Sequence, residues 1–231
     1  MSLMKPKNGM FRKFYGINSL ISPVDESKYR ELLPDQFDEH EAPQASAFIV
    51  HYQSVFPWPM TSYHEGAIFL KCMFDGKEYW YTYTMPVTKY VPMWGGRNMG
   101  FPKYVADSIT LIQSDQSWEG IVSHRKRTKL SLRFVPGLEA GPGPSEKFVI
   151  DQKAFFFGNG INLLPPSKGP KVITVDLLHQ VEPNWNPQYG MVKINSDKTE
   201  SHYGLFDTSK DYFGFYNEFD GGINLDPIRL R

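Results

Sequence analysis

Residues 96–104, GRNMGFPKY, place one lysine, Lys103, directly after a conformationally restricted approach. Pro102 fixes its own backbone angle φ and pushes Phe101 toward an extended conformation, while nearby glycines permit close contacts that other residues cannot make. A lysine held among apolar neighbours loses water, which disfavours its ammonium form, and a neutral amine can attack a ketone to form a Schiff base. These residue types make Lys103 a candidate nucleophile. A solvated lysine beside a surface turn is the alternative interpretation.

Other catalytic motifs are absent from the sequence, which contains no G-x-G-x-x-G, Walker loop, H-E-x-x-H or G-x-S-x-G. The six histidines lie far apart, and no pair has the spacing of metal ligands. Cys72 falls inside an apolar run, which predicts a buried structural thiol. The basic run HRKRTK, residues 124–129, fits either an anion-binding patch or a solvated hairpin, and the neutral overall charge favours the hairpin.

The composition suits one domain over residues 1–231, with 41% hydrophobic residues available for a core. Lys+Arg and Asp+Glu are equal at 25 each, which argues against a nucleic-acid or membrane-surface partner. No apolar run approaches the roughly 20 residues of a membrane helix, and the N-terminus does not resemble a signal peptide. The single cysteine fits a reducing compartment. We therefore expect a cytoplasmic protein.

A helix is expected at residues 22–34, where Asp25 is a suitable N-cap and Pro34 closes the segment. Strand signals dominate the rest of the chain because β-branched and aromatic residues cluster there. The expected strands are 45–52, 67–74, 78–85, 104–112, 118–124, 128–134, 171–178 and 189–195.

The turn signals show how these strands connect. Asp75-Gly76 is typical of a hairpin turn, and residues 136–144 form either a long loop or an inter-domain linker, of which the loop is favoured. Tyrosines alternate along residues 78–85 and line either a pocket or the core. The pattern predicts an α+β fold, mainly an antiparallel β-barrel or cone with a few peripheral helices.

The segment PMWGGRNMGFPKYVADSITL, residues 92–111, resembles the active-site segment of the acetoacetate decarboxylase family. That family carries a Gly-Arg, a short spacer, an aromatic residue, a proline and then the Schiff-base lysine. The matching residues here are Gly96, Arg97, Phe101, Pro102 and Lys103. Residues 63–85 resemble the stretch whose glutamate faces the lysine, and Glu65 falls at that position. The resemblance covers residues 20–112 well and the C-terminal half weakly.

The resemblance implies an acetoacetate decarboxylase-like fold and a Schiff base between Lys103 and a small keto acid. It implies that Glu65 faces the lysine and assists proton transfer; a rim carboxylate at the end of a strand is the alternative interpretation of Glu65. We expect Arg97, Phe101 and Tyr104 to contact the substrate, and a structural salt bridge is an equally good interpretation of Arg97. No organic or metal cofactor is expected, because the iminium on the lysine is itself the electron sink. The family also implies a homo-oligomer.

The chain departs from the family pattern at several positions. The decarboxylases place a second lysine directly after the catalytic one, where this chain has Tyr104; acetoacetate decarboxylase is the usual example of a lysine activated by desolvation or a cationic neighbour. Asn98 replaces a glutamate. The family's N-terminal arginine aligns near Tyr15, and its other active-site glutamate near Ile49.

Three functions remain in view. Decarboxylation of a β-keto acid through an imine on Lys103 is the leading one. An aldolase-dehydratase type of Schiff-base reaction, on pyruvate or another carbonyl compound, uses the same lysine and proton shuttle. A non-catalytic small-molecule binder on the same fold would also accommodate the departures at positions 98 and 104.

Overall fold

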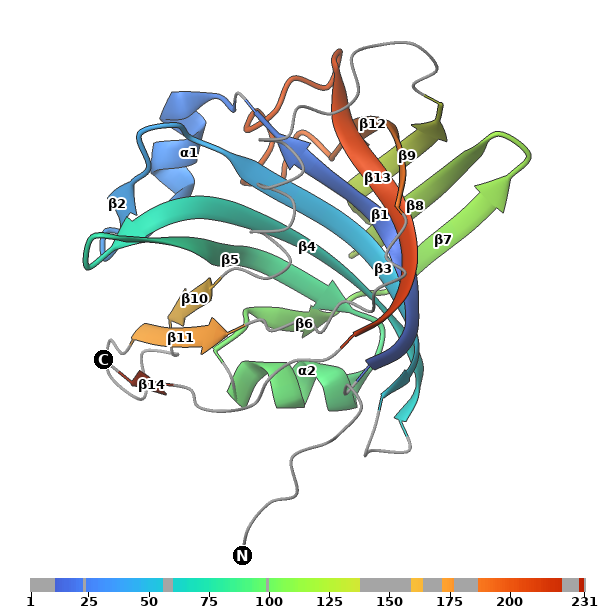
Figure 1. The fold of residues 1–231 in the computed structure, drawn as a ribbon, viewed down its shortest axis with the longest axis horizontal. Helices are drawn as coiled ribbons and strands as arrows, with labels where there is room; N and C mark the ends of the chain where they lie inside the picture. Colours follow the sequence, from blue (N-terminus) through green and yellow to red (C-terminus); the bar gives the residue numbers. More distant parts are fainter. Residues whose placement is uncertain are drawn as a thin grey trace, which may run out of the picture.

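The computed structural model describes residues 11–22, 24–55, 60–98, 100–137, 159–163, 172–176, 187–221 and 229–230. Within these residues the chain forms a single curled sheet with two helices beside it (Figure 1). The helices are α1 (Glu26–Leu32) and α2 (Tyr90–Asn98). The strands are β1 (Phe11–Ile21), β2 (Asp38–Glu39), β3 (Ala45–Val55), β4 (Met60–Phe74), β5 (Lys77–Val87), β6 (Lys103–Val105), β7 (Ser108–Ser114), β8 (Ser117–His124), β9 (Arg127–Pro136), β10 (Asn159–Leu163), β11 (Val172–Asp176), β12 (Gln188–Asn195), β13 (Asp211–Gly221) and β14 (Arg229–Leu230).

The sheet is mainly antiparallel. Its strand order is β14-β11-β10-β5-β4-β3-β1-β13-β12-β9-β8-β7, and β2 and β6 pair with β4 and β5 away from this path. The pairings of β10 and β6 with β5 are parallel, while the other described pairings are antiparallel. The predicted α+β fold with a barrel-like antiparallel sheet and peripheral helices is therefore confirmed.

Each face of the sheet carries its own apolar core. The larger core contains α1 residues such as Tyr29 together with Ile17, Ile49 and Ile68 from the central strands. The smaller core lies on the other face and contains Leu20, Phe48, Val50, Ala67, Phe69, Trp80, Met85, Phe101 and Phe215. Because side chains alternate along a strand, neighbouring residues of β3 and β4 serve different cores.

The expected helix and strands are largely present. Asp25 caps α1, since its side chain accepts a hydrogen bond from the Lys28 backbone amide at 2.8 Å. The Asp75-Gly76 pair forms the β4–β5 turn, with both residues in the left-handed region. The expected strand at 104–112 is wrong as a single element, because the chain breaks at Ala106 and Asp107 into β6 and β7. Most of the expected loop at 136–144 lies outside the described residues.

Helix α2 was not expected, because Pro92 and two glycines make its sequence a poor helix. Pro92 sits in the first turn, where its missing amide hydrogen costs no helical hydrogen bond. The helix ends in a Schellman motif: the Phe101 amide donates to the Gly96 carbonyl at 3.1 Å and the Gly100 amide donates to the Arg97 carbonyl at 3.1 Å. Gly100 has φ +82°, as this motif requires.

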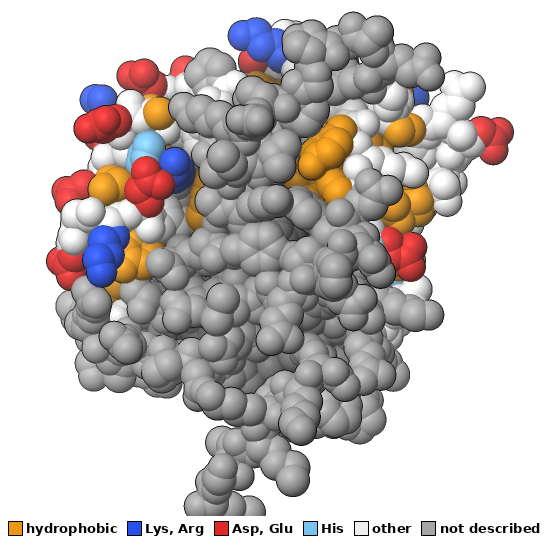
Figure 2. All heavy atoms as spheres, viewed as in Figure 1, with side chains coloured by type: hydrophobic (Ala, Val, Ile, Leu, Met, Phe, Trp, Pro, Cys, Tyr) orange, Lys and Arg blue, Asp and Glu red, His pale blue; other side chains and the backbone are white. Residues whose placement is uncertain are grey.

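The described surface mixes charges of both signs. Figure 2 shows acidic and basic side chains interspersed at the end of the molecule that carries α1 and β2. Two ion pairs there are Lys28–Glu31 and Arg30–Glu39, each at 2.7 Å. Neither described helix is long and apolar enough to cross a membrane. The single-domain organisation, the homo-oligomer and the cytoplasmic location stay predictions.

We predict that Gly100→Ala destabilises the protein by about 1–2 kcal/mol, because an alanine is strained in the left-handed conformation. The free energy of unfolding in urea measures the change. Gly95→Ala is the control: apart from its chain neighbours and the backbone of its own helix, no described atom lies within 4 Å of the added methyl group, and a glycine within a helix costs about 1 kcal/mol relative to alanine. The two variants should therefore shift stability in opposite directions, and equal shifts would contradict the assignment of Gly100.

Candidate active site

A buried ion pair joins the two residues predicted to be catalytic. Lys103 Nζ, from the start of β6, lies 2.5 Å from Glu65 Oε2 on β4, and the two side chains are 9% and 5% exposed. Removing two charges from water costs on the order of several kcal/mol per ion, so such a pair persists where close contact and added hydrogen bonds offset that cost. The geometry brings an amine and a proton acceptor into direct contact within a water-poor interior.

The glycine in the Gly-Arg motif makes room for the lysine side chain. A Cβ atom on Gly96 would lie 2.4 Å from Lys103 Cδ and 2.6 Å from Cε, closer than real contacts allow. The aliphatic chain of Lys103 therefore lies directly against helix α2. This contact directs the amine toward Glu65, and it explains why the poor helix former at position 96 is compatible with the fold.

Arg97 holds the backbone of the same lysine. Its Nε donates a hydrogen bond to the Lys103 carbonyl oxygen at 2.6 Å, while the rest of the residue is exposed. Together with the parallel pairing of Met85 with Lys103, this bond fixes the start of β6. In this structure Arg97 therefore positions the backbone of Lys103.

Aromatic rings surround the amine. Lys103 Nζ lies 6.0 Å from the ring centre of Tyr63 and 5.8 Å from that of Phe101, at the limit of a cation–π contact. The Tyr52 hydroxyl donates a long hydrogen bond, 3.4 Å, to Glu65 Oε1, and the Tyr52 and Tyr63 rings stack 4.8 Å apart. Burial, and then the charge of Glu65, raise the pKa of both phenols well above 10. Both tyrosines therefore stay protonated at neutral pH.

The pair faces the smaller core, so its surroundings are mostly apolar. One polar exception on this face is the buried pair Asn18–Asn217, in which Asn18 Nδ2 donates to Asn217 Oδ1 at 3.2 Å. Their remaining amide atoms, Asn18 Oδ1 and Asn217 Nδ2, have no hydrogen-bond partner among the described residues. Strand pairing puts Asn217, Gly16, Val50 and Glu65 in one row across the sheet.

The structure does not bring Tyr104 to this site. Because successive side chains of a strand point to opposite faces, Tyr104 projects away from Lys103 and lies beside His124, with ring centres 5.1 Å apart. Its predicted contact with a substrate at Lys103 is therefore not supported by its position. Tyr15 and Ile49, the positions aligned with the family's other polar groups, also face the larger core.

The chain matches the family model for acetoacetate decarboxylase over residues 19–179. It belongs to the acetoacetate decarboxylase family. This match extends well beyond the segment around Lys103, and it includes Glu65 and all of the central strands β3 to β9. No curated protein matches the chain.

Three solved structures share the fold of this chain. The enduracididine biosynthesis enzyme MppR, in complex with pyruvate, superposes with a TM-score of 0.67 at 16% identity over 98% of this chain and 92% of its own. An acetoacetate decarboxylase from Legionella pneumophila gives a TM-score of 0.63 at 15% identity, with 97% and 93% covered. Another acetoacetate decarboxylase gives 0.69 at 13% identity, with 93% and 85% covered. The TM-scores show a shared fold, and at these identities the likeness extends to the fold alone.

Sequence reasoning missed Tyr52 and Tyr63. Both lie directly opposite each other on β3 and β4, two residues from the row that holds Val50 and Glu65. The period of two along each strand could have placed Tyr63 on the face of Glu65, but Tyr52 requires the pairing register between strands. The structure therefore adds Tyr52 and Tyr63 to the residues of the candidate site, because strand pairing places both beside Glu65 and Lys103.

The remaining sequence candidates lie elsewhere. Cys72 is fully buried in the larger core, and burial raises the pKa of its thiol to about 12, which confirms the expected structural role. Among the described residues, no group of three or more His, Cys, Asp or Glu side chains could hold a metal ion. The expectation that no cofactor is needed stays a prediction.

We predict that Gly96→Ala displaces the Lys103 side chain and lowers whatever activity depends on the amine by about 100-fold, because misplacing a reacting group by about 1 Å has that effect. Stability should not fall comparably, since the lysine chain is flexible and alanine favours the helix. Activity and urea unfolding are measured together. Gly95→Ala, one residue away in the same helix, should retain full activity; a matching loss there would contradict the steric explanation.

Proposed function

We propose that the protein is a Schiff-base-forming carbon–carbon lyase that acts on a small β-keto acid through Lys103. The observation that carries the proposal is the buried contact of 2.5 Å between Lys103 Nζ and Glu65 Oε2. A lysine that served only to stabilise the fold would gain little from this position, since hydrophobic residues often replace buried ion pairs without loss of stability. An amine that must react gains a base in direct contact.

The first step uses this contact. Transfer of the proton from Lys103 Nζ to Glu65 Oε2 turns a buried charge pair into a neutral amine and a carboxylic acid, which suits the apolar surroundings. The amine then attacks the keto carbon, forming the C–N bond. Glu65 returns its proton as the carbonyl oxygen leaves as water, and the nitrogen becomes a positively charged iminium.

The second step breaks the carbon–carbon bond to the carboxylate. Its electron pair moves to the iminium nitrogen, carbon dioxide leaves, and an enamine remains on Lys103. Departure of an uncharged product from an anionic group is favoured in an apolar setting, and Phe101 with the smaller core provides one. A proton taken up from water and passed through Glu65 is delivered to the enamine carbon, which regenerates the iminium. Hydrolysis of this iminium by a second water molecule releases the ketone and restores the amine.

Two neighbours complete the proposed site. Phe101 is 4% exposed and packs beside the amine, so we assign it to the wall that contacts substrate. Arg97 fixes the Lys103 carbonyl through Nε, and its terminal nitrogens remain the candidate partners for the substrate carboxylate. Tyr104 is left out of this site because of its opposite orientation.

The alternative reaction is an aldolase-dehydratase type of condensation. A similar structure, that of MppR, is a complex with the condensation product of pyruvate and imidazole 4-carboxaldehyde. Tyr104 stands in place of the second lysine of the decarboxylases, but it points away from Lys103, so this replacement does not itself favour either reaction. The same iminium would lose a proton rather than carbon dioxide, and the resulting enamine would attack the aldehyde carbon to form a new carbon–carbon bond. Carbon dioxide release distinguishes the two reactions.

We predict that borohydride added with acetoacetate, or with pyruvate, traps an adduct on Lys103 that peptide mass spectrometry locates. Lys103→Arg should abolish trapping, and Glu65→Gln should slow it by about 10²–10⁴-fold, because a positioned acid–base group contributes that much. Release of carbon dioxide from acetoacetate then establishes the decarboxylase.

Lys71→Arg is the matched control, since Lys71 is also a partly buried lysine paired with a glutamate, Glu78, at 3.4 Å. It should trap as the unmodified protein does. Folded protein that forms no adduct with either carbonyl compound would overturn the Schiff-base proposal and favour a non-catalytic binder.

A further inference from the structure

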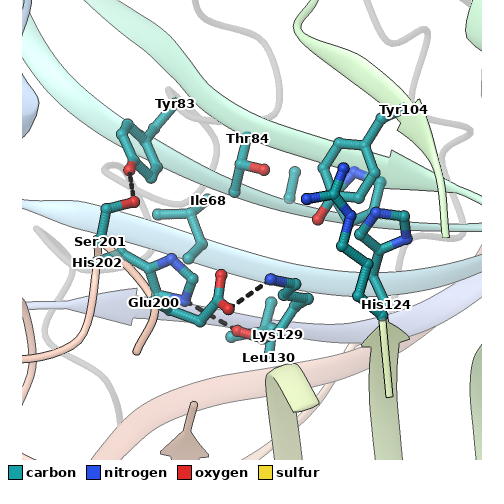
Figure 3. A pocket seen from close by; sticks show the side chains of 13 residues that line it. Ile68, Tyr83, Thr84, Tyr104, His124, Lys129, Leu130, Glu200, Ser201 and His202 are labelled. Carbon is teal, nitrogen blue, oxygen red and sulfur yellow. Dashed lines mark hydrogen bonds and ion pairs between the residues drawn. The ribbon is translucent and has the colours of Figure 1, made fainter. Parts of the chain in front are cut away.

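A cavity lies behind the strand that carries Lys103. Its volume is about 430 Å³, within the range of pockets that hold small molecules. Thr84, Tyr104 and His124 line one side, while Lys129 and Glu200 form an ion pair at 2.5 Å on the other (Figure 3). Tyr104 reaches it because it points to the opposite face from Lys103. The cavity is therefore separate from the site around Glu65.

A strained turn supplies one of its walls. His124 pairs with Arg127, so Arg125 and Lys126 are the two residues of the β8–β9 turn, with φ +51° and +60°. Such turns favour Asn and Gly, and the β4–β5 turn meets this preference with Asp75-Gly76. Two long cationic residues are a costly choice here. Backbone strain of this kind is often retained where the side chain has a function, and Arg125 lines the cavity.

The charges around the cavity leave Arg125 uncompensated. Lys129 and Glu200 neutralise each other, and the Arg125 guanidinium has no hydrogen bond or ion pair among the described residues. Asp107, outside the lining, accepts a hydrogen bond from the Lys126 amide at 3.3 Å and lies 3.5 Å from His124 Nδ1. Burial lowers the pKa of His202, which is therefore neutral near pH 7. The arginine, lysine and glutamate side chains of the lining thus sum to one net positive charge.

Hydroxyl groups supply the rest of the polar lining. Tyr83 and Ser201 hydrogen-bond to each other, as Figure 3 shows, and the hydroxyls of Thr84 and Tyr104 also line the cavity. Burial raises the pKa of Tyr104, so its phenol keeps its proton. Each hydroxyl retains an acceptor or donor position for a further partner. A guanidinium and neutral hydroxyls are the groups that recognise oxyanions bearing hydroxyl substituents.

We propose that this cavity is a binding site for a small hydroxylated oxyanion, held through its carboxylate or phosphate by Arg125 and through its polar skeleton by Tyr104 and the neighbouring hydroxyls. The ligand lies on the face of β6 opposite to Lys103. Its binding therefore does not require the amine.

Isothermal titration calorimetry with citrate and with inorganic phosphate tests the proposal. Citrate presents hydroxyl and carboxylate groups together, and phosphate presents the oxyanion alone. At least one probe should bind the unmodified protein at millimolar concentration or below. Arg125→Gln should weaken binding about ten- to hundredfold, because a charge-assisted hydrogen bond has that effect, and Tyr104→Phe should weaken it about three- to tenfold.

Lys126→Gln is the matched control, since it removes one positive charge from the same turn at a residue that does not line the cavity. It should leave affinity within about twofold. Equal losses of affinity in Arg125→Gln and Lys126→Gln would mean that the basic run, residues 124–129, attracts anions in general. That result would overturn the proposed binding site. If Tyr104→Phe binds the probe with unchanged affinity, the ion lies on the outside of the turn, and the assignment of the ligand to the cavity is wrong.

Lys103→Ala separates this site from the proposed catalytic one. The variant should bind the probes as the unmodified protein does, whether or not the Schiff-base reaction is confirmed. Loss of binding in Lys103→Ala would place the ligand at the amine, and absence of binding by both probes would exclude an oxyanion site. Either result would overturn the proposal.

Discussion

The buried pair of Lys103 and Glu65 constrains much of the structure around it. Two charges 2.5 Å apart and almost fully removed from water are tolerable where their geometry is held closely. The end of α2, the bond from Arg97 to the Lys103 carbonyl and the absence of a side chain at Gly96 together provide that geometry. The curled sheet fixes the other partner of the pair, because Glu65 lies within β4, which is held between β3 and β5.

The local signals around the lysine could be read from the sequence. Proline, glycine and aromatic residues before Lys103 indicated a rigid approach, and the family pattern placed Glu65 opposite. The pattern did not reveal that residues 90–98 form a helix, because intrinsic propensity disfavours it. A tertiary requirement, the passage of the lysine chain over position 96, has more influence there than propensity.

The rest of the site depends on register, which a sequence does not display. Tyr52 and Tyr63 meet only when β3 and β4 pair, and a shift of one residue turns a side chain to the other face. Tyr15 and Ile49 illustrate the consequence, since their neighbours Gly16 and Val50 are the residues on the face of Glu65. Strand β1 was missed because Gly16 and Asn18 are poor strand formers. The fold nevertheless requires a glycine at position 16, because a Cβ atom there would lie only 2.4 Å from the Ile49 carbonyl oxygen.

The alternation of β6 has a consequence for how the protein can change. Residues 103 and 104 are adjacent in the chain, but one belongs to the interior beside Glu65 and the other to the cavity beside His124. A substitution at position 104 therefore alters neither the volume nor the charge next to the amine. The two surroundings can be redesigned or diversify independently, although they share a strand of three residues and a single parallel pairing with β5.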